Sequence, residues 1–153
     1  MSEDTIVSLW IDASWRRGVG GVRISTSNGY EIVADEPKNM GGEGLGPTPV
    51  ELFLASLASC FVCTLRIHAR RLGIELDEVS VRVEGSFDML GFLDVEDAPR
   101  GFTKIKLVAK VSSKQCEDLD KLIDLALRTW IVGKTVERSN VLEVVVEKVC
   151  SKK

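Results

Sequence analysis

Hydrophobic and polar residues alternate over the first part of the chain, which is the pattern of β-strands with one buried face. The alternation runs from Thr5 to Asp12. Further on, Val22 to Thr26 and Tyr30 to Ala34 flank the turn Ser27-Asn28-Gly29. Asn-Gly between two β-prone runs is typical of a hairpin because both residues accept positive φ. We therefore predict a strand and then a hairpin in the N-terminal third.

A long helix is the clearest element of the sequence. A loop rich in glycine and proline, Asn39 to Pro47, leads to Thr48-Pro49-Val50-Glu51. These four residues combine a capping box with proline at the first helical position, and together they predict where the helix begins. Apolar residues then recur at helical spacing as far as Gly73, which is preceded by arginines. Glycine after basic residues predicts the end of the helix.

The middle of this helix is apolar around its whole circumference. No charged side chain occurs between Glu51 and Arg66, so we expect this part to be buried on all sides. A chain of 153 residues cannot easily cover such a helix alone, and we infer that a second copy supplies part of the cover. The uncharged stretch Leu52 to Leu65 is too short to span a bilayer.

The C-terminal half continues with two strands, a helix and a strand. Val79 to Phe87 and Thr103 to Val111 are strand-like and fit an antiparallel pair. Helical spacing follows from Gln115 to Arg128, and Val141 to Val149 closes the chain as a strand. We find no repeat or linker, so we predict one α+β domain over residues 1–153.

Charge and cysteine content narrow the class of protein. A net charge of −3 gives no general attraction to nucleic acid or to anionic lipid, and we expect neither as a partner. The first residues show no secretory signal. Four cysteines in a chain of this size do not form the dense framework of a small secreted domain, and the chain needs no disulfide. We expect a cytoplasmic protein.

The segment from Gly41 to Cys60 carries a resemblance. This glycine-rich loop and the helix up to its first cysteine resemble the glycine loop and cysteine helix of the OsmC/Ohr family, which comprises osmotically inducible and organic hydroperoxide resistance proteins. Val81-Arg82-Val83-Glu84-Gly85 and the closing helix and strand follow in the family's order. The resemblance therefore covers almost the whole chain.

Membership of this family implies a fold and an activity. The fold is an intertwined homodimer in which antiparallel sheets wrap around long central helices, with active sites at the subunit interface. The activity is a cysteine peroxidase that reduces organic hydroperoxides in the response to oxidative stress. A thiolate attacks the O–O bond, a sulfenic acid forms, and a second cysteine condenses with it. No cofactor is implied.

The resemblance also implies three catalytic positions. Cys60 corresponds to the reactive cysteine, and Glu51 corresponds to a glutamate at the start of the same helix. An arginine from the N-terminal strands completes the set. Arg23 fits this position best, with Arg16 or Arg17 as substitutes. A cation is needed because apolar surroundings disfavour a thiolate.

Helical geometry makes a dimer necessary if Glu51 and Cys60 serve one site. Nine residues at about 100° each place these two side chains on nearly opposite faces, roughly 13 Å apart along the axis. They cannot touch within one chain. We therefore expect Glu51 of the partner subunit to complete the site in an obligate homodimer.

The second cysteine of the family is missing. Peroxidatic members carry it in a Cys-Pro-Val-x-x-Thr segment, and Trp130 stands at the corresponding position here. An indole cannot resolve a sulfenic acid, so recycling must use an external thiol or dithiol, or Cys63. Cys63 lies within disulfide range of Cys60 on a helix, but we favour it as a small core residue. Trp130 either fills the core or lines an apolar pocket over Cys60.

Other residues receive structural interpretations. His68, the sole histidine, is expected on the helix surface, and Cys116 and Cys150 are expected to have no special role. We expect no metal, because the cysteines and His68 lack the usual ligand spacing. The loop Gly41 to Gly46 is interpreted as a hinge-like connection, and Met89 to Pro99 as a segment able to border the cleft as a lid.

Two functions of different classes remain after this reasoning. In the first, the protein reduces organic hydroperoxides through Cys60 with non-standard recycling. In the second, it is a non-catalytic dimer that binds a small molecule or has a structural role. An accessible Cys60 beside an arginine would favour the first, and a thiol blocked by Trp130 would favour the second.

Overall fold

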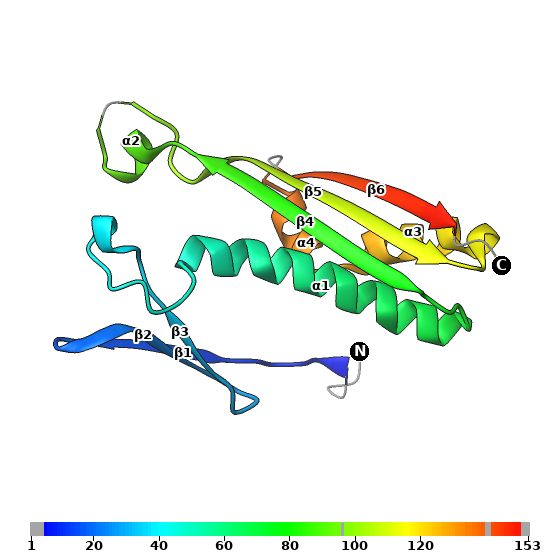
Figure 1. Cartoon of the computed structure of the whole chain (residues 1–153), viewed down its shortest axis with the longest axis horizontal. Helices are drawn as coiled ribbons and strands as arrows, with labels where there is room; N and C mark the ends of the chain where they lie inside the picture. The colour runs from blue at the N-terminus through cyan, green and yellow to red at the C-terminus, as the bar shows by residue number, and fades with distance from the viewer. Residues whose placement is uncertain (1–4, 96, 140–141, 151–153) are drawn as a thin grey trace. The chain divides into compact units, whose positions relative to one another are not determined.

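The computed structural model describes residues 5–95, 97–139 and 142–150, and Figure 1 shows its elements. The chain divides into two compact units, an N-terminal unit of residues 1–53 and a C-terminal unit of residues 54–153. Each unit has a three-stranded sheet. The mixed α+β class predicted from the sequence is confirmed. The sequence predicts a single domain over residues 1–153, and the division into two compact units does not test that prediction.

The N-terminal unit contains an antiparallel sheet in the order β1-β2-β3. The strands are β1 (Ile11–Arg16), β2 (Val19–Thr26) and β3 (Glu31–Ala34). The predicted strand from Thr5 is wrong in its first part, because residues 6–10 are not in a strand. Thr26 at the end of β2 pairs with Ile11, so the chain before Ile11 lies beyond the end of β2.

The hairpin between β2 and β3 is confirmed, and its turn is formed by Ser27, Asn28 and Gly29 as predicted. The Gly29 N–H donates to the Thr26 carbonyl at 2.9 Å, and the Thr26 N–H donates to the Tyr30 carbonyl at 2.9 Å. Gly29 has φ +81°, whereas Asn28 is not among the described residues with positive φ. Only the glycine therefore uses the left-handed conformation that both residues were expected to adopt.

Helix α1 (Pro49–Leu72) begins and ends where the sequence predicts. At its start, the Glu51 N–H donates to the Thr48 hydroxyl at 3.2 Å, and the Thr48 N–H donates to Glu51 Oε2 at 2.8 Å. This reciprocal pair is a capping box. At its end, Gly73 has φ +68° and the Ile74 N–H donates to the Ala69 carbonyl at 2.9 Å. That closure is a Schellman motif, which requires a left-handed residue.

The C-terminal unit contains a mixed sheet in the order β4-β5-β6. Strands β4 (Glu78–Phe87) and β5 (Phe102–Ser113) are antiparallel, as predicted. Strand β6 (Leu142–Cys150) is parallel to β5, which the sequence did not predict. Val141, the predicted first residue of this strand, lies outside the described residues.

Two helices provide the crossover that a parallel pair requires. Helix α3 (Cys116–Thr129) agrees with the predicted helix, and α4 (Ile131–Glu137) follows directly after Trp130. A short helix, α2 (Met89–Phe92), lies between β4 and β5, and a 3₁₀ turn, η2 (Lys38–Met40), precedes α1. Neither α2 nor α4 was predicted.

One face of the β4-β5-β6 sheet carries the core of the C-terminal unit. Alternate residues of β5 are buried against α1 and α3, which pack on the same face of the sheet (Figure 1). The opposite face carries Lys104, Lys106 and Lys110, which pair with Glu143 and Glu147 of β6. The core comprises Leu57, Phe61, Leu65, Ala69, Ile74, Ile105, Leu107, Ala109, Val111, Leu119, Leu122, Ile123, Ala126 and Trp130.

Helix α1 is buried on one side only in the single chain. Its buried residues are Leu57, Phe61, Leu65, His68 and Ala69, so the expectation of burial on all sides is not met by one copy. The helix has 24 residues and contains an 18-residue window with a mean hydropathy of 1.8, so it is long and apolar enough to cross a membrane by length and composition. The sequence-based prediction considered only the uncharged stretch from Leu52 to Leu65 and therefore underestimated the length of the apolar helix. Core helices of soluble proteins have the same properties.

Candidate functional site

Cys60 lies near the middle of α1, at the border between its buried and exposed sides. Its thiol is free and half-buried, and the side chain packs against the core of the C-terminal unit. The neighbouring hydroxyl of Thr64 donates to the Cys60 carbonyl at 2.8 Å and so is not directed at the sulfur. Within the described residues, no hydrogen bond reaches the Cys60 sulfur. Among the described residues of one chain, no group therefore forms a hydrogen bond that could activate this thiol.

Cys60 belongs to a line of residues along α1 that we call the α1 seam: Phe53, Ser56, Cys60, Cys63 and Ile67. They are spaced three and four residues apart, which is the spacing of a helix–helix contact. Phe53 is 37% exposed and Ile67 is 59% exposed. The seam thus presents small and apolar residues to the surface of the single chain.

Cys63 is exposed, so its interpretation as a core residue is wrong. The prediction assumed that α1 is buried on all sides, whereas in the single chain Cys63 lies on the side of α1 that is opposite the packed face. Both Cys60 and Cys63 are free thiols. Their three-residue spacing keeps open the disulfide considered from the sequence.

Glu51 is an exposed residue of the first turn of α1, and its carboxylate caps the helix. Oε2 accepts the backbone N–H of Thr48 at 2.8 Å and the Thr48 hydroxyl at 3.0 Å. These bonds, first the backbone one and then the hydroxyl, hold the pKa of Glu51 below its ordinary value. Glu51 is consequently an ionised carboxylate with a fixed position at the helix start.

The three candidate arginines lie around the β1–β2 hairpin. Arg16 and Arg23 line one open pocket of about 180 Å³ together with Ser14, Val19 and Gly21. Neither guanidinium forms an ion pair within the described residues. Arg17 lies in the turn that joins the strands. Two of the three candidates therefore share one face of the sheet, and both are available to an anion.

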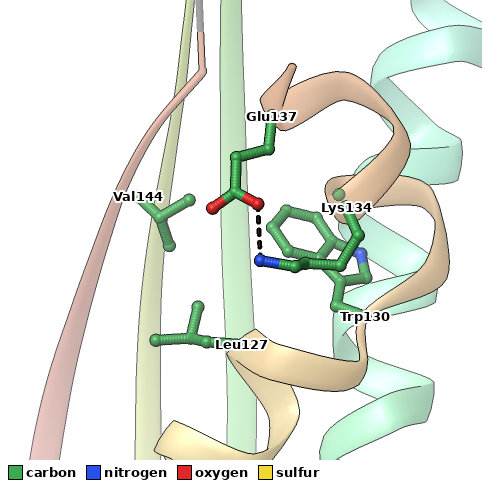
Figure 2. A pocket seen from close by; sticks show the side chains of 6 residues that line it. Leu127, Trp130, Lys134, Glu137 and Val144 are labelled. Carbon is green, nitrogen blue, oxygen red and sulfur yellow. Dashed lines mark hydrogen bonds and ion pairs between the residues drawn. The ribbon is translucent and has the colours of Figure 1, made fainter. Parts of the chain in front are cut away.

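Trp130 is 2% exposed and joins α3 to α4. Its indole packs edge to face on Phe61, with ring centroids 5.0 Å apart. It also lines a pocket of about 270 Å³ together with Leu127, Gly133, Lys134, Glu137 and Val144. In Figure 2 the six-membered ring points toward the Lys134–Glu137 ion pair, and the indole nitrogen lies on the far side of the ring. Trp130 is thus a core residue that also borders a pocket.

His68 is buried, so its expected place on the helix surface is wrong. It is 8% exposed, and its Nε2 lies 2.6 Å from the Thr129 hydroxyl, which donates to the Leu125 carbonyl at 2.7 Å. Because that hydroxyl proton is already used, Nε2 carries a proton and donates. The contact joins α1 to α3, and no local sequence pattern predicts it because the two residues are 61 positions apart.

Asp35 is a buried carboxylate that the sequence reasoning missed. Oδ2 accepts the N–H groups of Glu43 at 3.0 Å and Leu45 at 3.1 Å, and Oδ1 accepts the N–H of Glu36 at 2.9 Å. The loop before α1 is therefore held by Asp35 and is not a free hinge. Gly42 and Gly46 allow this packing, because a Cβ on either would collide with the carbonyl of Glu36 or Val33.

Cys116 and Cys150 form a disulfide, so the expectation that both have no special role is wrong. Their Cα atoms are 5.6 Å apart although 34 positions separate them in the sequence. The bond joins the first residue of α3 to the last residue of β6. The two cysteines meet because β6 pairs in parallel with β5, and no local sequence pattern predicts that pairing.

Metal ligands were not expected from the sequence. In the part of the chain that the structure describes, no group of three or more His, Cys, Asp or Glu residues could hold a metal ion.

A known protein family matches most of the chain. Residues 41–145 match the family model described as OsmC-like protein. The chain belongs to the OsmC-like family. The matched region contains Glu51, Cys60, Cys63 and Trp130 but not Arg16 or Arg23. The match therefore leaves the site arginine unassigned.

Similar proteins support the OsmC-like fold. A protein of Acinetobacter baylyi, ACIAD3023, is 27% identical over 110 residues, which are 71% of this chain and 72% of that protein. The crystal structure of an OsmC-like protein from Mycoplasma pneumoniae has a TM-score of 0.75 at 20% identity, covering 95% of this chain and 99% of that one. The organic hydroperoxide resistance protein OhrB of Bacillus subtilis has a TM-score of 0.59 at 25% identity, covering 94% and 98%.

Proposed function

We propose that this OsmC-like protein is a thiol-dependent peroxidase that reduces organic hydroperoxides through Cys60. The observation that carries the proposal is a free, half-buried cysteine in the middle of the helix that the family model matches. The names of OhrB and of a Legionella pneumophila relative, both organic hydroperoxide resistance proteins, support the substrate class. We further propose a cytoplasmic location and no cofactor.

The reaction proceeds in two halves. The Cys60 thiolate attacks one oxygen of the hydroperoxide, the O–O bond breaks, and the alkoxide leaves and takes a proton to become an alcohol. Cys60 becomes a sulfenic acid. One thiol of an external dithiol then displaces water from that sulfenic acid, and the second thiol releases Cys60 as the dithiol closes to a disulfide.

Activation of the Cys60 thiol requires a cation, which we assign to Arg23 or Arg16. Both guanidinium groups lack an ion-pair partner within the described residues, so both are free to stabilise a thiolate. The capped carboxylate of Glu51 remains ionised and is suited to orient a guanidinium. Because Glu51 and Cys60 lie on opposite faces of α1, the Glu51 that serves a given Cys60 comes from a second copy.

A homodimer formed along the α1 seam fits this requirement. Two seams packed together would cover Phe53, Cys63 and Ile67, which are exposed in the single chain. The small residues Ser56, Cys60 and Cys63 would let two helix backbones approach closely.

Recycling departs from the family scheme because Trp130 occupies the position of the second cysteine. Its indole is packed on Phe61 and offers no sulfur. We therefore assign the reduction of the sulfenic acid to an external thiol or dithiol. Cys63, a free thiol three residues after Cys60 on the same helix, is the alternative within the chain.

A turnover assay with matched variants tests the proposal. The protein is incubated with cumene hydroperoxide and dithiothreitol, and the loss of hydroperoxide is followed. Cys60→Ser should abolish turnover, and Cys63→Ser should leave it unchanged if the external dithiol acts directly. Loss of turnover in Cys63→Ser as well as in Cys60→Ser would make Cys63 the resolving residue. Equal rates for the wild type and Cys60→Ser would refute the peroxidase.

The second candidate is a non-catalytic binding protein. The pocket of about 270 Å³ bordered by Trp130 and the Lys134–Glu137 ion pair favours it, because it combines an apolar wall with charged groups. An inactive wild-type protein that binds a small molecule with quenching of Trp130 fluorescence would support this candidate over the peroxidase.

A further inference from the structure

The Cys116–Cys150 disulfide joins two elements that do not carry Cys60. Cys116 is the first residue of α3, and Cys150 is the last residue of β6. Strand β6 is an edge strand, because the order of its sheet is β4-β5-β6. The disulfide therefore ties the last residue of an edge strand to the first residue of helix α3.

A second link between the same two elements lies beside the disulfide. Lys148 of β6 pairs with Asp120 of α3. Asp120 follows Cys116 by four residues and so lies on the same helix face, and Lys148 precedes Cys150 by two residues and so lies on the same strand face. When the covalent bond is open, α3 stays next to the sheet because Leu119, Leu122, Ile123 and Ala126 are buried in the core, and the exposed ion pair adds little to this. Opening the disulfide consequently leaves both sulfurs close enough to pair again.

The two sulfurs differ in their surroundings. Cys150 is exposed, whereas Cys116 is half-buried. Attack by an external thiolate at Cys150 would release Cys116 as the leaving thiolate. The N–H groups at the start of a 14-residue helix stabilise a negative charge there, although Glu117 and Asp118 in the same turn oppose it. A stabilised leaving thiolate accelerates exchange.

We propose that Cys116 and Cys150 form a second redox-active site, which undergoes reversible exchange with thiols and disulfides and locks β6 to α3. In the forward step, two equivalents of a small thiol break the protein S–S bond, are oxidised to a disulfide, and leave two protein thiols. In the reverse step, a small disulfide takes two electrons and the two protons from the protein dithiol. In the cytoplasm, the few disulfides that form are usually catalytic or redox-sensing.

The test uses the full chain with Cys60→Ser and Cys63→Ser, so that only this pair can react and peroxidase chemistry is removed. The native protein is equilibrated in buffers of graded ratios of reduced to oxidised glutathione, treated with iodoacetamide, and weighed intact. We expect both cysteines to be protected in oxidising buffer and labelled together in reducing buffer. Protection should return when the reduced sample is transferred to oxidising buffer, without a change in far-ultraviolet circular dichroism.

Two results would overturn the proposal. Labelling of the native protein in fully oxidising buffer would mean that the disulfide does not form. Protection that persists under reducing conditions until denaturant is added would make the bond a static support. Cys150→Ser in the same background is the control, since Cys116 should then be labelled in reducing buffer and should gain the mass of one glutathione in oxidising buffer, where no second protein thiol can displace it. Differential alkylation of the wild-type chain with peptide mapping gives the same readout if the double variant does not fold.

Discussion

Asp35 shows how a single side chain prepares the candidate site. Its carboxylate ties the segment from Glu36 to Leu45 to the end of β3 through three backbone N–H groups. That segment leads directly to the cap of α1. Bonding, foremost by the N–H of Leu45, holds the pKa of Asp35 below its ordinary value, and burial opposes this effect.

Replacing Asp35 by asparagine should destabilise the protein in a pH-dependent way. Because the folded-state pKa is depressed, the stabilising contribution is present above the unfolded-state pKa of about 3.9 and is lost as the pH falls through the folded-state value. Urea unfolding at neutral pH should show Asp35→Asn to be less stable than the wild type. The difference should shrink below about pH 4, and a difference that is constant with pH would contradict this account.

The contribution of Trp130 to the packing of the core can be tested by substitution. Trp130→Ala should cost about 3 to 5 kcal/mol of unfolding free energy because it leaves a cavity beside Phe61. Trp130→Phe should cost distinctly less, since a smaller ring retains the aromatic contact and no hydrogen bond to the indole nitrogen is lost. Denaturant titration measures both. Equal costs for the two variants would contradict a packing role.

The elements differ in how far the sequence determines them. The limits of α1 were predictable because the capping box and Gly73 are local signals with a defined geometry. The parallel pairing of β6 was not, because it depends on α4 and on contacts between distant segments. The burial of His68 and the Cys116–Cys150 bond have the same origin, since each joins residues that are far apart in the sequence. The places of Cys60 and Glu51 on α1 were predictable from motif and helix position, and their catalytic roles stay predictions, whereas Asp35 had no local signature.

The cap of α1 can be tested directly. Thr48→Ala removes the hydroxyl that accepts the Glu51 N–H and should cost about 1 kcal/mol of unfolding free energy. Thr48→Ser keeps a hydroxyl at the cap and is the matched control, with an expected change near zero. Thermal or urea unfolding distinguishes the two variants. A Thr48→Ala variant as stable as the Thr48→Ser variant would show that the helix start does not depend on this bond.

At the scale of the whole molecule, the account requires a dimer through the α1 seam. Ile67→Glu introduces a charge into the proposed contact and should weaken association at least about tenfold, since burying an unpaired charge costs more than 1.4 kcal/mol. Ile131→Glu is the control, because Ile131 is 77% exposed on α4, away from the seam. Light scattering after size-exclusion chromatography over a range of concentrations measures both. A monomeric wild-type protein, or equal effects of the two variants, would contradict the seam.

The proposed chemistry depends on the reactivity of one sulfur, and the most direct measurement is the mass of the protein after a single exposure to hydroperoxide. The wild type is treated with a small excess of cumene hydroperoxide in the presence of a sulfenic-acid trap and weighed intact, with Cys60→Ser and Cys63→Ser alongside. Rapid trapping at Cys60 is expected, and it should be retained in Cys63→Ser and absent in Cys60→Ser. A Cys60 that stays reduced while free thiols in the same solution oxidise would contradict the proposed chemistry.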